Sequence, residues 1–191
     1  MELKKLQTLV ANLYNAKHAG RDGWADWLYQ NHVLWVAHKT DEFCTQFGAN
    51  PNIAVAAALV HDIADTVMQR EDKGHEQKSL QLGRQLCQEA GYNPEDIAII
   101  IDDIAAKHAC HDGIVPQSAE GRLMTAADAS SHYQTDFYLH TFYADDFGSY
   151  QVRKEWARKK IDRDFKEKIF HEEIREMVRP DYNALKHIFL Y

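Results

Sequence analysis

Apolar positions recur at helical spacing along almost the whole chain. Over residues 3–18 the apolar side chains lie three or four positions apart, as on one face of an amphipathic helix. Similar spacing predicts helices over roughly residues 24–47, 75–90 and 94–108, and strand signals are nearly absent. The continuous apolar run over residues 53–60 predicts a helix that is buried on all sides. The pattern therefore indicates an all-α fold.

Glycine and proline fall between these predicted helices. Gly20 and Gly23 interrupt the pattern after the first helix. Pro51 suits the first turn of the buried helix, which we expect to run to about Asp65. Gly91 suits the position just after residues 75–90, because a helix often ends on a left-handed residue.

The last part of the chain also has a helical pattern. From residue 152 to residue 190 it predicts helix, with a break at Arg179–Pro180–Asp181 because proline lacks a backbone N–H. The basic segment Arg153–Lys160 has many acidic neighbours, which favours a solvated helix over a nucleic-acid site.

Composition narrows the function classes. The chain has 191 residues, 45% hydrophobic, and a formal net charge of −7 that argues against broad nucleic-acid binding. Its three cysteines are odd in number and lack CxxC spacing, which favours reduced thiols. The N-terminus lacks the apolar core of a signal peptide, and no stretch reaches ~18 apolar residues. We therefore expect a cytoplasmic protein with no membrane partner.

Two histidines and two aspartates suggest a metal site. His61 and Asp62 close the apolar run, and a carboxylate rarely ends such a helix without a partner. His32 lies upstream, and Asp128 lies downstream in a run of small residues. Two imidazoles and two carboxylates suit a divalent transition metal. The alternative for Asp62 alone is an ordinary solvated aspartate at a helix end.

The order His … His-Asp … Asp resembles that of the HD-domain superfamily of metal-dependent phosphohydrolases. Three further segments follow in the order of the small, stand-alone, all-helical bacterial members: Gly74-His-Glu-Gln-Lys-Ser79, Ile104-Ala-Ala-Lys-His108 and Glu120-Gly-Arg-Leu-Met-Thr-Ala-Ala-Asp128. The resemblance implies one HD-type helical domain over residues 1–191, with a motif core at about 20–135 and a C-terminal helical extension at about 136–191.

The resemblance also implies an activity and a set of residue roles. It implies that His32, His61, Asp62 and Asp128 hold a divalent metal, with Mn, Ni, Co, Fe, Zn and Mg as the candidates. The chain would then be a phosphohydrolase acting on a nucleotide or another small phosphate ester. Catalytic roles would fall to Asp65, which would orient or deprotonate the attacking water, and to His75 and His108, which would balance charge. A homodimer is left open.

Two departures from the family pattern keep other functions open. Trp35 stands where many relatives carry a basic residue, and Ala126 stands where the most similar type carries an aspartate. One alternative is a dinuclear centre with His75 and His108 as extra ligands, as in HD phosphodiesterases and di-iron oxygenases. Another is a ligand-sensing protein that keeps the metal but does not catalyse. His132 matches no motif position.

Overall fold

The computed structural model describes residues 1–143 and 148–190 of the chain and confirms the all-α prediction. No strand occurs within these two ranges. None of their helices is long and apolar enough to cross a membrane. The three cysteines are buried and form no disulfide.

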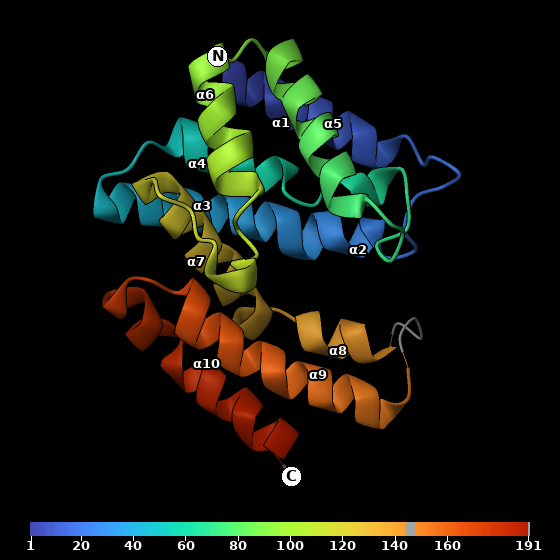
Figure 1. Ribbon diagram of the computed structural model, residues 1–191, viewed down its shortest axis with the longest axis vertical. Coiled ribbons are helices and arrows are strands. Elements are labelled where there is room, and N and C mark those ends of the chain that lie inside the picture. The colour runs from blue at the N-terminus through green and yellow to red at the C-terminus, as the bar shows by residue number, and fades with distance from the viewer. Residues whose placement is uncertain (144–147, 191) are drawn as a thin grey trace.

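The helices follow one another closely along the chain (Figure 1). Their bounds are α1 Glu2–Asn15, α2 Ala25–Leu28, α3 Leu34–Phe47, α4 Pro51–Val60, α5 His75–Ala90, α6 Pro94–Ala98, α7 Ala119–Gln134, α8 Phe137–Tyr143, α9 Tyr150–Arg163 and α10 Glu172–Leu190. Short 3₁₀ helices span Ile63–Thr66 and His111–Gly113. Wider π-helical segments span Tyr29–Val33, Ile99–Ala105 and Asp164–Lys168.

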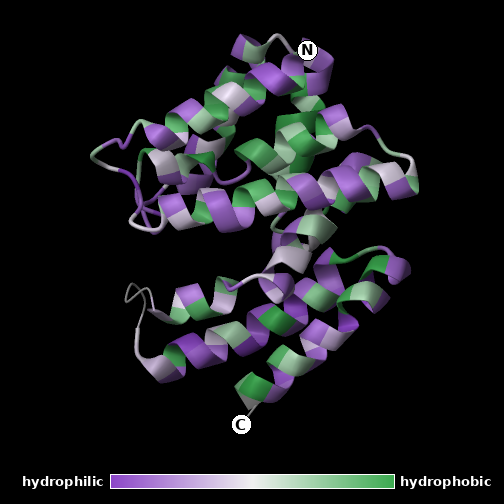
Figure 2. Cartoon of the chain, turned by 180° about the vertical axis from the view of Figure 1, so that it is seen from behind, coloured by the Kyte–Doolittle hydropathy of each residue, from purple (hydrophilic) through white to green (hydrophobic). Residues whose placement is uncertain are grey.

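Helix α4 is the centre of the N-terminal helices. Every residue from Ile53 to Val60 is buried, as the continuous apolar run predicted. The helix contacts α1, α3, α5 and α7, which enclose it with their apolar faces. Figure 2 shows this hydrophobic helix among neighbours whose hydrophobic and hydrophilic residues alternate. The last residues of α4 are therefore held away from bulk solvent.

Helix α7 joins two groups of helices. Figure 1 shows α1–α6 on one side of it and α8–α10 on the other. It packs on α3 and α4 at one face, and on α10 and the Asp164–Lys168 segment at another. A residue in the middle of α7 can therefore be reached by side chains from both groups.

The predicted end of the buried helix was wrong. Helix α4 ends at Val60 instead of near Asp65. Asp62 has φ −115° and ψ 23°, which is not helical, and a 3₁₀ turn follows. The 3₁₀ turn is held by other contacts, because the Ser79 hydroxyl accepts a hydrogen bond from the Ala64 N–H at 3.1 Å. Asp65 consequently lies in the 3₁₀ turn and not on α4.

The predicted break at Pro180 was also wrong. Pro180 lies inside α10, and the chain leaves the helical path earlier, at Ile169, with φ −97° and ψ 96°. A proline removes only one helical hydrogen bond directly. Val178 before it and Tyr182 after it are both buried, so packing of one continuous face supports the helix across the proline.

Substitution of Gly121 tests how closely the chain packs against the first turn of α7. A Cβ added there would lie 2.4 Å from Pro116 Cβ and 3.0 Å from the Ser118 Oγ that caps the helix. Overpacking of this kind typically destabilises by about 1–3 kcal/mol. We predict that Gly121→Ala lowers the free energy of unfolding by that amount in urea titrations.

Gly23 is the matched control, because no atom lies within 4 Å of a Cβ added there. We expect Gly23→Ala to change stability by less than about 0.5 kcal/mol. Equal effects of the two substitutions would contradict the packing described for α7.

Candidate metal centre

The four predicted metal ligands lie close together. His32, His61 and Asp128 form one group whose potential ligand atoms lie within 4.8 Å of one another, and Asp62 Oδ2 lies 3.8 Å from His32 Nε2. His32 comes from the π-helical segment before α3, His61 and Asp62 from the end of α4, and Asp128 from the middle of α7. The two Nε2 atoms of the histidines are 3.1 Å apart. Asp128 Oδ1 is 3.3 Å from His32 Nε2, and Asp62 Oδ2 is 3.4 Å from His61 Nε2. Asp62 alone has some exposure, 13% of its side chain.

Hydrogen bonds fix which nitrogen of each imidazole carries the proton. His61 Nδ1 lies 2.8 Å from the Ala58 carbonyl oxygen, which can only accept. His32 Nδ1 lies 2.9 Å from the Ser131 hydroxyl, which already donates its proton to the Asp128 carbonyl at 2.7 Å. Both Nδ1 atoms therefore donate, so in the neutral form of each ring the lone pair is on Nε2. Bonds of this kind commonly orient metal-binding histidines.

The arrangement of donor atoms fits a divalent metal. Burial lowers the pKa of His32 more than the neighbouring Asp128 raises it, so the ring is neutral. Two neutral nitrogen lone pairs at 3.1 Å repel each other unless a cation lies between them. Ligands at about 2.1 Å from a metal and at right angles to each other are about 3 Å apart, as here.

The two carboxylates are ionised despite their burial. Burial alone would raise the pKa of Asp62, but the Arg70 guanidinium outweighs it and holds the pKa well below its usual range. Burial acts in the same way on Asp128, where Lys168 and His132 outweigh it. Both groups can therefore serve as anionic ligands at neutral pH.

His108 lies beside this centre. Its ring is 5.0 Å from the His61 ring, centroid to centroid, and meets it edge-on. His61, Asp62 and His108 form a second group whose potential ligand atoms lie within 4.8 Å of one another. Since its Nδ1 donates to the Ala105 carbonyl at 2.7 Å, its free nitrogen is Nε2. Burial lowers the pKa of His108 to about 4.

Asp65 and His75 contact each other behind the centre. Asp65 is fully buried, and its Oδ1 is 3.1 Å from His75 Nε2. Its other oxygen forms an ion pair with Arg70. With both oxygens engaged in this way, Asp65 is better placed to position Arg70 than to take a proton from water.

Sequence reasoning missed Arg70. Its guanidinium Nη2 lies 2.9 Å from Asp62 Oδ2 and also contacts Asp65, so it links the predicted ligand to the buried carboxylate. The guanidinium carbon stands 4.7 Å from the centre of the Trp24 ring. Arg70 opens a polar interval that looked like an ordinary loop. The local sequence gives no signal of this contact, because the contact depends on how the loop of residues 67–74 folds back toward Asp62.

His132 was missed although a signal existed. It follows Asp128 by four residues on α7, so the two side chains share a face. His132 Nε2 is 3.7 Å from Asp128 Oδ1, and its ring stacks on that of His32 at 5.6 Å. Its other nitrogen, Nδ1, is 2.8 Å from the buried carboxylate of Asp164.

The C-terminal helices add a buried lysine, Lys168, and a partly buried one, Lys160, that sequence reasoning also missed. Lys168 forms an ion pair with Asp128, and Lys160 lies 2.8 Å from Asp164. The rest of the basic segment matches the expected solvated helix, since Lys159 is 77% exposed. The π-helical segment Asp164–Lys168 alters the phase of the helix, and π-helical turns are often found at functional sites.

Comparison with known proteins agrees with the site. The HD domain family matches residues 29–132, a range that contains His32, His61, Asp62 and Asp128. The chain is 31% identical over 100 residues to Ribonuclease Y of Alkaliphilus metalliredigens (strain QYMF), a match covering 52% of the chain and 19% of that protein. It is 29% identical over 101 residues to Ribonuclease Y 1 of Pediococcus pentosaceus (strain ATCC 25745 / CCUG 21536 / LMG 10740 / 183-1w), covering 53% and 17%.

The matched region is thus less than a fifth of the length of these relatives, and no solved structure matches the chain. The family match spans more than half of the chain, and its all-α fold is the one observed. The chain belongs to the HD domain family.

Proposed function

We propose that the chain is a divalent-metal-dependent phosphohydrolase acting on a nucleotide or another small phosphate ester. The observation that carries this proposal is the pair of free imidazole nitrogens 3.1 Å apart, flanked by two carboxylates. Membership of the HD domain family supports hydrolysis as the reaction. The relatives named Ribonuclease Y share too little of their length with this chain to transfer a substrate.

Each residue of the centre has a distinct proposed role. His32, His61, Asp62 and Asp128 would hold the metal. A bound divalent ion lowers the pKa of water and polarises a phosphoryl oxygen. The protein side chains would orient the ester, accept the proton of the nucleophile and offset the developing negative charge.

His108 is the best-placed proton acceptor. Its Nδ1–H is fixed by the Ala105 carbonyl, which leaves Nε2 free beside His61 and Asp62. With its pKa lowered to about 4, the ring is neutral at pH 7 and has an available lone pair. A base within hydrogen-bond reach of the nucleophile is what general-base catalysis requires.

Arg70 is placed to offset negative charge. Because Asp65 is fully buried and pairs with both Arg70 and His75, it holds the guanidinium beside Asp62. Preorganised cations of this kind stabilise charge that develops on phosphoryl oxygens. We therefore propose that Asp65 and His75 act through Arg70, while Arg70 itself meets the substrate.

The dinuclear alternative has partial support. Among the described residues, His108 belongs to a group that could hold a second metal with His61 and Asp62, whereas His75 belongs to none and faces Asp65. A second ion would thus lack one of the two extra ligands that this alternative assumed.

A substrate panel tests the proposed function. The purified chain, supplied in turn with Mn²⁺, Ni²⁺, Co²⁺ and Mg²⁺, is assayed with p-nitrophenyl phosphate and with nucleoside mono-, di- and triphosphates. We expect phosphate release with at least one metal, and its loss in EDTA. If no metal supports turnover of any of these compounds, the non-catalytic ligand-sensing alternative is favoured.

Replacing Asp62 tests the metal site. We predict that the purified parent carries about one divalent transition ion per chain and that Asp62→Ala loses it, because an anionic ligand is removed. The fold should survive, since Arg70 keeps Asp65 as a partner. Elemental analysis measures the metal, and circular dichroism measures the helical content.

Asp41 is a suitable control for this variant, because it is an exposed aspartate on α3. We expect Asp41→Ala to keep the metal. Full metal occupancy in Asp62→Ala would remove Asp62 from the ligand set.

Replacing His108 separates catalysis from metal binding. We predict that His108→Ala keeps the ion and lowers turnover by the ~10²–10⁴-fold typical of a lost acid or base. His111→Ala is the control, since the His111 side chain is 60% exposed on the neighbouring loop. Loss of a second equivalent of metal in His108→Ala would instead establish the dinuclear centre.

A further inference from the structure

Lys168 is a buried cation at the centre that lies outside the family match. Its side chain is only 3% exposed, and its ammonium forms an ion pair with Asp128. It comes from the segment between α9 and α10, beyond the matched residues 29–132. The C-terminal helices therefore contribute directly to the candidate site.

Lys168 is charged in this position. The carboxylate of Asp128 is the counter-charge with which its ammonium pairs. A protonated lysine has three donors. Asp128 is the one hydrogen-bonding partner of Lys168 among the described residues.

The charged side chains around the centre balance one another. Asp62 and Asp65 pair with Arg70, Asp128 pairs with Lys168, and Asp164 pairs with Lys160 and Arg163. Four carboxylates thus face four cationic side chains. A divalent ion would leave two positive charges without a protein counter-charge.

We propose that Lys168 binds the terminal phosphate of the substrate and so favours phosphomonoesters over phosphodiesters. The proposal rests on the proposed function and names its substrate class. A phosphomonoester has a charge of about −1.5 to −2 at pH 7, and matches the two uncompensated charges. A diester has one negative charge and two non-bridging oxygens, whereas a monoester has three.

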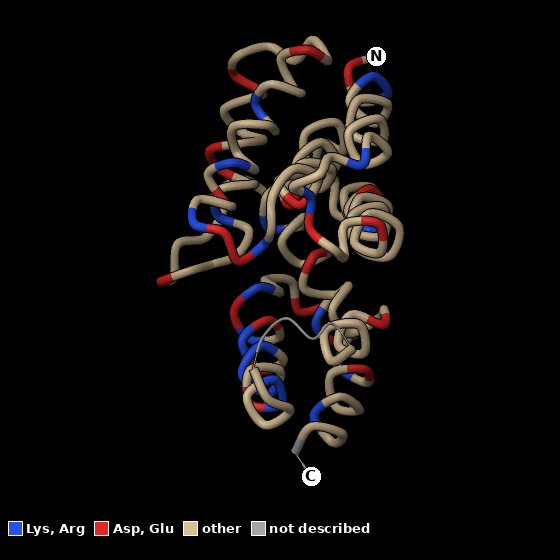
Figure 3. The backbone as a smooth tube through the Cα atoms, turned by 90° about the vertical axis from the view of Figure 1, so that its right-hand side faces the viewer, with Lys and Arg blue, Asp and Glu red and all other residues tan. Residues whose placement is uncertain are grey.

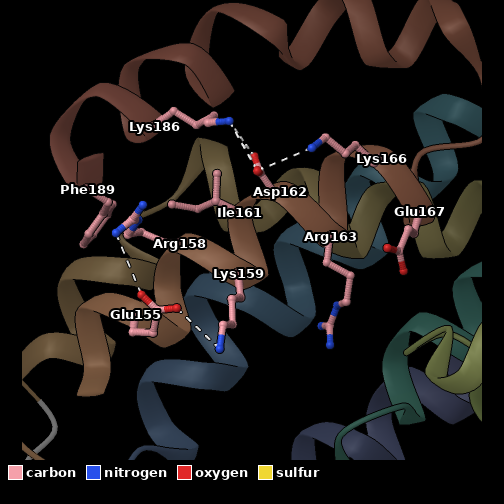
Figure 4. Close-up of a pocket in the computed structure, with 10 residues that line it drawn as sticks. All are labelled: Glu155, Arg158, Lys159, Ile161, Asp162, Arg163, Lys166, Glu167, Lys186 and Phe189. Atoms are coloured by element: carbon pink, nitrogen blue, oxygen red, sulfur yellow. Dashed lines mark hydrogen bonds and ion pairs between the residues drawn. The ribbon is translucent and has the colours of Figure 1, made fainter. Parts of the chain in front are cut away.

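Exposed basic residues also lie on the helix that leads to Lys168. Figure 3 shows Lys and Arg gathered on α9, the helix that leads to Lys168. Figure 4 shows a cavity of about 390 Å³ between α9 and α10, into which several of these side chains project. In this cavity Lys186 and Lys166 pair with Asp162, at 2.9 and 3.4 Å, and Lys159 pairs with Glu155. These cations are largely satisfied, so the cavity is not itself proposed as a binding site.

The rival explanation is that Lys168 only neutralises Asp128. Both explanations predict that a lysine belongs beside that carboxylate. The two explanations differ in how replacement of Lys168 changes the binding of phosphate. A purely neutralising lysine contributes to stability and leaves phosphate binding by the loaded centre unchanged. A phosphate-binding lysine competes with the metal for Asp128 yet supports the substrate.

Lys168→Met tests the proposal, with Lys166→Met as the matched control on the same segment. Lys166 is 61% exposed and pairs with Asp162, away from Asp128. Calorimetry measures Mn²⁺ affinity, and then the affinity of inorganic phosphate for the Mn²⁺-loaded protein. Kinetics compare p-nitrophenyl phosphate with bis(p-nitrophenyl) phosphate.

For Lys168→Met we expect Mn²⁺ to bind more tightly, because a competing cation is removed, and phosphate to bind more weakly. We expect kcat/KM for the monoester to fall about 10²-fold, as when one preorganised donor is lost. The value for the diester should change little, and Lys166→Met should resemble the parent. Lys168→Arg, which keeps the charge, should recover part of the phosphate affinity.

Three results would overturn the proposal. One is unchanged phosphate affinity in Lys168→Met, and another is an equal fall in monoester and diester turnover. The third is a parent enzyme that prefers the diester, which decides the matter even if Lys168→Met does not fold. A parent that binds no Mn²⁺ at all would overturn the proposed function, and this inference with it.

Discussion

The close approach of two buried imidazole nitrogens is the interaction on which the rest of the site depends. His32 and His61 bring their Nε2 lone pairs to 3.1 Å in a buried environment, with each Nδ1–H already donated elsewhere. Two like dipoles so arranged are unfavourable without a cation between them. The helices that hold the rings must therefore supply the stabilisation, and a metal would relieve the repulsion.

The fold supplies this stabilisation by burying the helices that carry the ligands. The apolar helix α4 ends at His61, and its burial fixes where that ring stands. On α7 the residues around Asp128 are small, and Ala127 and Ala129 are fully buried, so α3 and α4 can pack closely against that helix. The C-terminal helices cover α7 from the other side and bring a cation to Asp128. Both groups of helices are thus needed to set the charge of the centre.

Sequence reasoning succeeded where the signal was local and failed where it depended on folding. The helices followed from apolar spacing, and the convergence of His32, His61, Asp62 and Asp128 followed from their residue types and order. Lys168 and Arg70 could not be found in this way, because a π-helical turn and a loop that folds back bring them to the carboxylates. The end of α4 was predicted too late because no glycine or proline marks it. Pro180 misled in the opposite direction, since tertiary packing carries α10 across it.

Anomalous X-ray scattering from crystals soaked in Mn²⁺ tests the central claim most directly. Data collected near the manganese absorption edge locate the ion without reference to any activity. We predict an anomalous peak bound by His32 and His61 through Nε2 and by the carboxylates of Asp62 and Asp128. A peak elsewhere, with the His32 and His61 rings still 3.1 Å apart and no density between them, would contradict it.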